Sequence, residues 1–521
     1  MNFGTVDLII FASYFLLIVI IGLWVSRTKK GEQKNSADYF LASRSLPWWA
    51  IGASLIASNI SAEQFIGMSG SGYVIGLGIA SYEWMAALTL IIVAKFFLPV
   101  FLKKGIYTMP QFLEVRFDRR VRTSLAVFWV LVYVFVNLTS VLYLGALALR
   151  TIMGVKLIYG IIGLALFSAL YSIYGGLKAV AWTDVIQVIF LMAGGLIATY
   201  FVLDYLGNGH GVFAGFSNLF KQAPEKFHMI LSRSNPHFKE LPGISVIIGG
   251  MWIANLSYWG CNQYIIQKAL AAKNIKEAQR GLAFAGYLKI LIPLIVVIPG
   301  IAAFALHADI AKPDEAYPWV LNNFVFTGFK GLAFAALIAA VVSSLSAMIN
   351  STSTIFTMDI YRNYIKKDAS EKNLVLTGRI TSAVALLIAV GVAPQLVTLE
   401  QAFQFIQEFT GFVSPGIVAI FIAGMFWKRA TANSALWAAI LTVPLSFLFK
   451  FLTPQMAFLN RMGVVFLILM VIIFFISIYE SKTDDPKAIE INKKLFHTGT
   501  KFNIAAIGIM IILSALYALF W

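Results

Sequence analysis

Charge and reactive side chains are scarce in this chain. Of its 521 residues, 24 are acidic, five are histidine and one is cysteine. The single cysteine, Cys261, excludes a disulfide within the chain. All the histidines fall in or beside expected loops, which argues against a buried metal centre. Charged residues make up 12% of the chain and hydrophobic residues 60%. This composition excludes a soluble multi-domain enzyme and indicates a membrane protein.

Most of the chain consists of long apolar segments. Segments of roughly twenty residues, the length that spans a bilayer, recur along the whole chain, and we count fourteen. They begin near residues 7, 45, 78, 122, 157, 181, 243, 278, 326, 374, 400, 431, 460 and 502. The pattern predicts an all-α polytopic protein in which residues 1–521 form one transmembrane domain with the lipid bilayer as its surroundings.

Basic residues account for the net charge of +16, and they gather in alternate loops. Examples are the stretches from Arg27 to Arg44, from Lys103 to Arg122 and from Lys268 to Arg280. The positive-inside rule places such loops in the cytoplasm and both termini outside it. Because these residues do not form a basic surface interleaved with aromatic side chains, nucleic acid is not an expected partner.

Two apolar segments contain a polar break. The first break is SNISAEQ, residues 58–64, and the second is ANLSYWGCNQY, residues 254–264. An unsatisfied backbone group in hydrocarbon costs several kcal/mol, so irregular backbone at this depth has to line a cavity or bind a ligand. Broken helices at matching places in two halves of a chain are typical of the substrate site of a secondary transporter.

Ionisable residues within the apolar segments are candidates for function because burying a charge is costly. Glu83 and Lys289 have opposite charges and apolar neighbours on both sides, so we expect them to share one cavity. Asp359 and Glu408 lie near the ends of their segments, and contact with headgroups or water remains an alternative for them. The full set is Glu63, Glu83, Asp184, Lys289, Asp359 and Glu408.

Two adjacent hydroxyls, Ser343 and Ser344, interrupt a long apolar helix expected over residues 326–358. Serines in such helices commonly bond back to their own helix, which is the plain alternative. A monovalent cation, however, needs several oxygen ligands, and carbonyls freed at a helix break supply them. A sodium site built from the carbonyls of Ala57 and Ile60 with Ala340, Ser343 and Ser344 is therefore predicted.

Several of these segments closely resemble the sodium/solute symporter family, in particular its bacterial carriers for galactose and glucose. The likeness spans nearly the whole chain and is strongest in ASNISAEQFIGMSGSGY (57–73), WIANLSYWGCNQYIIQ (252–267) and AFQFIQEFTGFVSPG (402–416). It implies a leucine-transporter-type fold with two inverted five-helix repeats at residues 45–207 and 243–426. One extra helix would precede the repeats, and three would follow within residues 431–521.

The resemblance also implies roles for individual residues. Substrate contacts would come from Gln64, Glu83, Asn255, Lys289 and Gln407. Met68, Tyr82 and Phe403 would close the outer side of the site, and Tyr258, with Trp259 behind it, would form the inner gate. Asp184 corresponds to an acid that guides sodium toward the cytoplasm.

The implied function is sodium-coupled uptake of a neutral hexose, such as galactose or glucose, by alternating access across a bacterial inner membrane. The protein would not be an enzyme, sodium would be the coupling ion, and no organic cofactor is expected. This chain has Ala86 where the galactose-type pattern has a serine, which leaves the preferred sugar open. The alternatives are another small solute, such as inositol or sialic acid, and a substrate-gated sensor. Sodium stoichiometry and oligomeric state do not follow from the sequence.

Overall fold

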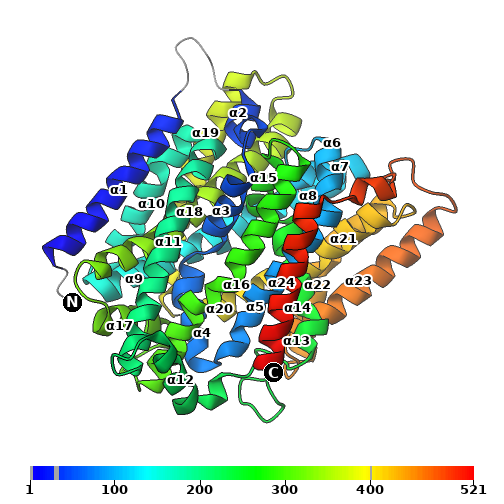
Figure 1. The fold of residues 1–521 in the computed structure, drawn as a ribbon. Helices are drawn as coiled ribbons and strands as arrows, with labels where there is room; N and C mark the ends of the chain where they lie inside the picture. Colours follow the sequence, from blue (N-terminus) through cyan, green and yellow to red (C-terminus); the bar gives the residue numbers. More distant parts are fainter. Residues whose placement is uncertain (1–3, 28–34, 399–401) are drawn as a thin grey trace.

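The computed structural model describes residues 4–27, 35–398 and 402–521, and this part of the chain is a bundle of helices without strands (Figure 1). Twelve spans in it are long and apolar enough to cross a membrane. Eight are single uninterrupted helices: α1 (Thr5–Val25), α10 (Leu157–Gly175), α11 (Leu177–Leu206), α16 (Ile275–Ala305), α19 (Glu371–Val392), α22 (Ala432–Leu452), α23 (Phe458–Glu480) and α24 (Thr500–Leu519).

The other spans are built from consecutive pieces, most of them joined by π-helical turns. The pieces are α5 (Ser81–Ile92) with α6 (Leu98–Lys104), α8 (Arg119–Val132) with α9 (Thr139–Met153), α18 (Phe329–Ile355) with the π-helical stretch Phe356–Ile365, and α20 (Ala402–Gly411) with α21 (Ser414–Phe426). π-helical turns often mark functional positions, because they disturb the regular backbone pairing.

Two further crossings are interrupted, and they coincide with the two polar breaks predicted from the sequence. The first consists of α3 (Trp48–Asn59), a π-helical turn and α4 (Ser69–Val74), and its backbone is extended at Ile60. The second consists of α14 (Gly250–Leu256), a π-helical turn and α15 (Gln263–Leu270), with extended backbone at Asn262. Together with the twelve long spans they account for the fourteen predicted crossings.

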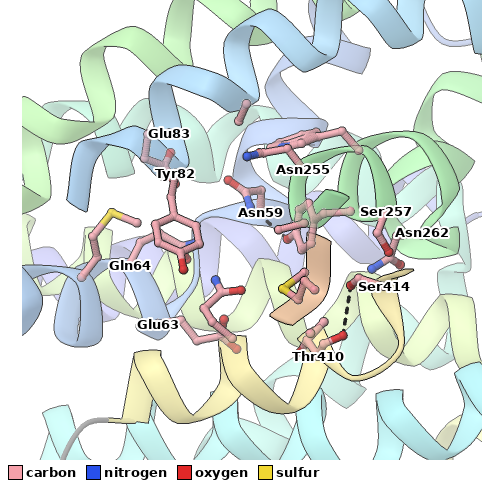
Figure 2. Close-up of a pocket in the computed structure, with 18 of the residues that line it drawn as sticks. Asn59, Glu63, Gln64, Tyr82, Glu83, Asn255, Ser257, Asn262, Thr410 and Ser414 are labelled. Carbon is pink, nitrogen blue, oxygen red and sulfur yellow. Dashed lines mark hydrogen bonds between the residues drawn. The ribbon is translucent and has the colours of Figure 1, made fainter. Parts of the chain in front are cut away.

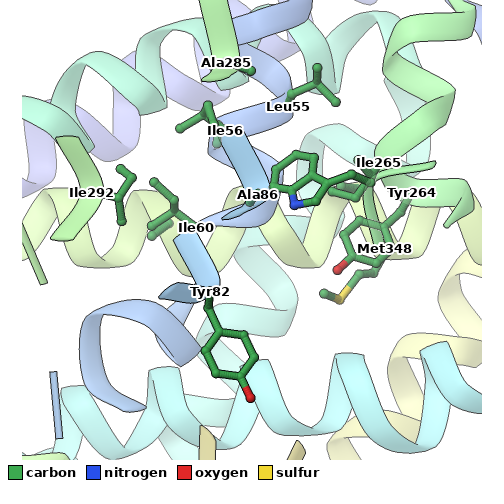
Figure 3. Close-up of a cluster of buried hydrophobic side chains, with 14 of the residues drawn as sticks. Leu55, Ile56, Ile60, Tyr82, Ala86, Tyr264, Ile265, Ala285, Ile292 and Met348 are labelled. Atoms are coloured by element: carbon green, nitrogen blue, oxygen red, sulfur yellow. The ribbon is translucent and has the colours of Figure 1, made fainter. Parts of the chain in front are cut away.

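The first broken crossing lies in the centre of the bundle. α3 packs against α11, α16 and α18, and α16 also packs against α4 and α5. Figure 3 shows Leu55, Ile56 and Ile60 of this crossing among apolar side chains such as Ile292 of α16. α1 lies at one edge of the bundle, and α22 and α23 lie at the opposite edge (Figure 1). The interrupted backbone is therefore enclosed by protein.

Small residues on α11 allow this close packing. A Cβ atom at Gly194 would lie 2.6 Å from the Cβ atom of Ala336 on α18, and one at Gly195 would lie 2.0 Å from the side chain of Ile295 on α16. Membrane helices that pack tightly use small residues in this way, because the backbones can then approach each other. The adjacent glycines thus seat α11 between two helices that also contact α3.

The structure corrects the placement of two basic residues that the sequence assigned to a loop. The Arg116 side chain, at the end of α7 (Met109–Arg116), is buried and donates to the backbone carbonyls of Gly424 and Ala430. Arg122 is buried on α8 and lies 2.6 Å from Asp359. Contact of Asp359 with headgroups or water is therefore wrong, because its carboxylate is fully buried. These helix ends fold onto one another, and the two guanidinium groups hold them together.

Asp7 attaches the first helix to the bundle. Its carboxylate is fully buried and accepts hydrogen bonds from the backbone amides of Gly328 (2.7 Å) and Gly331 (2.6 Å) at the start of α18. Gly328 has a φ of +90°, a conformation that favours glycine. A Cβ atom at Gly331 would lie 2.6 Å from Asp7 Cα. A carboxylate at a helix N-terminus is stabilised by the free amides and by the helix dipole.

We expect Asp7→Ala to lower the stability of the purified protein by about 1–3 kcal/mol, because the amides at the start of α18 lose a charged acceptor. The measurement is the midpoint of thermal unfolding in detergent. Asp309→Ala removes a carboxylate from an exposed position in the loop that follows α16 and is the matched control. Equal midpoints for the two variants would show that the Asp7 contact does not stabilise the fold.

Candidate functional site

A polar cavity lies between the two breaks (Figure 2). Its lining includes all the residues expected to contact substrate: Gln64, Glu83, Asn255, Lys289 and Gln407. Met68, Tyr82, Tyr258 and Trp259, which were expected to form gates, line it as well. The side chain of Phe403 lies outside the described part of the chain. Residues from distant parts of the sequence therefore meet in one cavity, as the resemblance implied.

Glu83 and Lys289 form a buried ion pair in the wall of this cavity. Glu83 comes from the first turn of α5 and Lys289 from the middle of α16, and the ammonium donates directly to the carboxylate. The Lys289 side chain is 1% exposed and that of Glu83 is 3% exposed. Lys289 Nζ also lies 5.1 Å from the centre of the Trp259 ring. Each charge thus offsets the burial cost of the other, and the aromatic face adds to this for the ammonium.

Gln64 ties the cavity to the break in the first crossing. Its side-chain oxygen accepts hydrogen bonds from the backbone amide of Ser61 (2.9 Å) and from the Ser61 hydroxyl (3.1 Å). The amide of Ser61 would otherwise be unpaired where the helix restarts. Because the oxygen of Gln64 is engaged in this way, the side chain offers a ligand its N–H donors.

Tyr258 links the two broken crossings. Its hydroxyl accepts hydrogen bonds from the Asn59 side chain (2.9 Å) in the first break and from the Tyr264 hydroxyl (2.6 Å) at the end of the second. Tyr258 also lines a second cavity, which is adjacent to the first and includes Tyr133 and Asn137. A side chain in the walls of two neighbouring cavities, held from both broken helices, is well placed to separate them.

Several polar residues of the cavity were not assigned to the site from the sequence. They are Asn59, Glu63, Ser257, Asn262, Thr410 and Ser414, which Figure 2 labels around the central space. Four of them lie in the two polar breaks, so the breaks themselves were the available signal. Oε1 of Glu63 is buried and has no hydrogen-bond partner among the described residues. The cavity therefore has a second carboxylate in addition to Glu83.

The predicted sodium ligands also come together. Ala57, Ile60, Ala340, Ser343 and Ser344 are all fully buried. The Ser344 hydroxyl on α18 donates to the carbonyls of Ser58 (3.0 Å) and Ile60 (3.4 Å), across the break in the first crossing. The Ser343 hydroxyl donates to Asp184 Oδ1 (2.5 Å). The alternative that these serines bond back to their own helix is wrong, and sodium binding at the cluster remains a prediction.

Asp184, expected on the route of sodium to the cytoplasm, is fully buried on α11 beside these serines. It also pairs with Lys268, whose Nζ lies 2.9 Å from Asp184 Oδ2. The sequence placed Lys268 in a cytoplasmic loop, and the structure corrects this. Lys268 lies in the last turn of α15 and is 1% exposed. Its aliphatic stem lets it follow an apolar helix while its ammonium reaches a carboxylate in the interior.

Residues 39–442 match the model of the sodium:solute symporter family. The chain belongs to this family. It is 55% identical to the sodium/glucose cotransporter of Vibrio parahaemolyticus, over 99% of this chain and 98% of that one. It is also 33% identical to the sodium/myo-inositol cotransporter 2 of Oryctolagus cuniculus, over 85% of this chain and 69% of that protein. Members of the family are sodium-coupled transporters and not enzymes.

Two solved structures share the fold. A sodium-coupled sialic acid symporter in an outward-open state superposes with a TM-score of 0.79 at 24% identity, covering 92% of this chain and 98% of that one. The nucleobase-cation-symport-1 transporter Mhp1 superposes with a TM-score of 0.56 at 16% identity, covering 88% and 98%. The expected leucine-transporter-type architecture is thus confirmed for the fold class.

We expect Lys289→Met to destabilise the protein by about 3–5 kcal/mol, because it leaves the Glu83 carboxylate buried without its counter-charge. Adding Glu83→Gln should restore most of this loss, since the double variant buries no unpaired charge. The measurement is thermal unfolding in detergent without added solute. Lys95→Met is the control, because Lys95 is only partly buried and lies against Phe96 outside the cavity. A double variant no more stable than Lys289→Met would show that the two charges are not coupled.

Proposed function

We propose that this protein is a sodium-coupled symporter that carries a neutral hexose, such as galactose or glucose, into the cell. Membership of the sodium:solute symporter family supports the coupling ion. The 55% identical relative named a sodium/glucose cotransporter supports the sugar. The cavity between the two broken crossings is the proposed sugar site, and the cluster around Ser344 is the proposed sodium site.

The charge of the cavity is the observation that carries the choice of a neutral solute. Among the described residues that line it, Lys289 is the one cation, and Glu83 already neutralises it. Glu63 adds a further carboxylate. An anionic solute would find no free positive partner there and would face a carboxylate. A solute with hydroxyl groups can instead bond to the amides of the lining, so a sugar fits this cavity better than a sialic acid does.

We assign the sugar contacts to the residues named from the sequence: Gln64, Glu83, Asn255, Lys289 and Gln407. A hexose presents several hydroxyls that each donate and accept, and one left unpaired in a buried site costs about 1–3 kcal/mol. Amide, carboxylate and ammonium groups together provide donors and acceptors for them. Tyr258 is suited to stack on the sugar ring, with Trp259 behind it.

Sodium is proposed to bind to oxygen atoms of Ala57, Ile60, Ala340, Ser343 and Ser344 and to leave toward the cytoplasm past Asp184. Binding there favours the outward-open state and completes the sugar site. One sodium ion that moves down 100 mV and a tenfold gradient releases about 3.7 kcal/mol. That free energy supports a sugar gradient of several hundredfold, so one ion per sugar is sufficient.

Alternating access follows from the same assignment. Met68, Tyr82 and Phe403 form the outer gate, and Tyr258 with Trp259 forms the inner gate. The inverted repeats are assigned to residues 45–207 and 243–426, and residues 431–521 supply additional helices. We place the protein in a bacterial inner membrane with both termini outside the cytoplasm. In Figure 1 both chain ends lie in the lower half of the view, away from α2 (Ser36–Leu41), which supports placing them on the same side of the membrane.

A neutral polyol is the second candidate for the cargo. The relative at 33% identity is named a sodium/myo-inositol cotransporter, and myo-inositol presents hydroxyls without a charge, as a hexose does. A panel of radiolabelled solutes, offered to proteoliposomes under an inward sodium gradient, separates these candidates. Accumulation above the external concentration distinguishes a symporter from a sensor.

We expect Ser344→Ala to abolish sodium-driven accumulation of hexose while the protein stays folded and inserted, because the variant removes a hydroxyl ligand beside the break. Uptake into proteoliposomes with and without a sodium gradient is the measurement. The control is Thr352→Ala on the same helix, since the Thr352 hydroxyl bonds back to the carbonyl of Met348 at 2.8 Å. Sodium-stimulated uptake of wild-type size in Ser344→Ala would remove the proposed ion site.

We expect Ala86→Ser to shift selectivity toward galactose. Ala86 lines the cavity and is 1% exposed, so a hydroxyl added there can reach a bound sugar. A net neutral hydrogen bond contributes about 0.5–1.5 kcal/mol, which is a twofold to tenfold change in affinity. Competition of galactose against glucose, at equal sodium in proteoliposomes, measures the shift. An unchanged ratio would show that residue 86 does not contact the sugar.

A further inference from the structure

Asp184 has a place in the transport scheme described so far, but its ion-pair partner Lys268 has none. Both side chains are buried, at 1% and 0% exposure, and the ammonium lies 2.9 Å from Asp184 Oδ2. A charge inside a membrane protein is costly to bury and usually marks an ion or substrate pathway. This pair joins α15, the second half of a broken crossing, to α11 in the centre of the bundle.

Asp184 accepts hydrogen bonds from α3 and α18, the two helices that carry most of the proposed sodium ligands. It accepts hydrogen bonds from Ser54 Oγ (2.5 Å) on α3 and from Ser343 Oγ (2.5 Å) on α18, in addition to Lys268. Ser58 belongs to both groups of contacts. Its hydroxyl donates to Asp184 (3.3 Å), and its carbonyl accepts from Ser344 (3.0 Å). Hydrogen bonds of Ser58 and Ser343 therefore connect Asp184, the partner of the ammonium, to the proposed sodium ligands.

The bond from Ser343 to Asp184 has a consequence for a cation. A serine hydroxyl has one proton and two lone pairs. When Asp184 accepts the proton, the lone pairs of Ser343 remain available to a metal ion on the other side. Asp184 thus orients a proposed sodium ligand, and its own negative charge adds to the attraction of any cation nearby.

An unpaired carboxylate at this position would hold sodium strongly. Charges separated by a few ångströms in a protein interior interact far more strongly than in water, so one uncompensated carboxylate tightens a neighbouring cation site by roughly tenfold or more. Tight binding favours loading from outside, but it slows release into the cytoplasm. A carrier needs the ion to leave in each cycle.

On the basis of the proposed function, we propose that Lys268 is a tethered cation that neutralises Asp184 and thereby keeps the sodium site weak enough to empty toward the cytoplasm. Lys268 is a positioning residue in this scheme, since it acts on sodium through Asp184 and does not contact the sugar. The sodium ion passing Asp184 competes with an ammonium that cannot diffuse away. Once the ion has left, the Lys268 ammonium pairs with the Asp184 carboxylate again.

The test measures sodium affinity apart from transport. Purified variants are titrated with sodium chloride at constant ionic strength, with choline as the replacing cation, and the half-maximal sodium concentration is read from thermal stabilisation in detergent. We expect Lys268→Met to lower this concentration at least tenfold and to reduce the turnover of sugar accumulation in proteoliposomes. Lys273→Met removes an exposed lysine next to the same helix and should keep the wild-type sodium affinity.

Asp184→Asn supplies a second and independent comparison. It leaves the Lys268 ammonium uncompensated beside the sodium site, so we expect sodium affinity to fall at least tenfold. The double variant Lys268→Met/Asp184→Asn has neither charge and should return to within threefold of wild type. Comparing Asp184→Asn with the double variant tests the proposal even if Lys268→Met alone does not fold. A double variant as weak as Asp184→Asn would overturn the proposal and make the pair a structural bridge.

The outcomes also separate this inference from the proposed function. A wild-type protein that responds to sodium, together with a Ser344→Ala variant that does not, supports the sodium site. In that case, sodium affinity that is indifferent to Lys268 overturns only the role of the lysine. A wild-type protein without any sodium response overturns both.

Discussion

The backbone groups left unpaired at the break in the first crossing determine how the surrounding helices pack. In a continuous helix each carbonyl is paired within the helix, whereas the carbonyls near Ser58 and Ile60 have to find partners elsewhere. The Ser344 hydroxyl from α18 donates to these carbonyls, and the Gln64 side-chain oxygen accepts from the freed backbone amide of Ser61. These partners require α3, α18 and the restart of the helix to meet in the interior. The glycines of α11 and the apolar contacts of α16 make that meeting possible.

Two buried lysine–carboxylate pairs lie close to this centre, and they differ in what surrounds them. Lys289 and Glu83 belong to the wall of the polar cavity, where a solute can reach them. Lys268 and Asp184 are enclosed by serines of α3 and α18. A buried pair contributes little net stability compared with apolar packing of the same volume. Their presence at both places is therefore better explained by the ions and solutes that this family moves than by the stability of the fold.

The number of crossings and the two breaks were predictable from the sequence, whereas only part of the cavity lining was. Apolar length and polar interruption are local properties, so the segments around Ser58 and Tyr258 were apparent without the structure. The substrate residues depended on resemblance, because nothing in their spacing shows that Gln64 and Gln407 share a cavity. Arg122 and Lys268 were misplaced, since a basic residue near a helix end follows the topology rule whether its side chain turns outward or inward. Such a pairing is tertiary and leaves no trace in the sequence pattern.

The attachment of α1 has a practical consequence for work with shortened chains. Most of α1 faces away from the bundle, and the helix precedes the repeats to which the transport site is assigned. It therefore looks dispensable. Asp7, however, supplies the acceptor for the amides that begin α18, and α18 is the helix that carries Ser343 and Ser344. Deleting the first helix would open the N-terminus of that helix to lipid or solvent. An N-terminal truncation would thus also affect the helix that carries the proposed ion site, and a fusion partner is better joined to the opposite end of the chain.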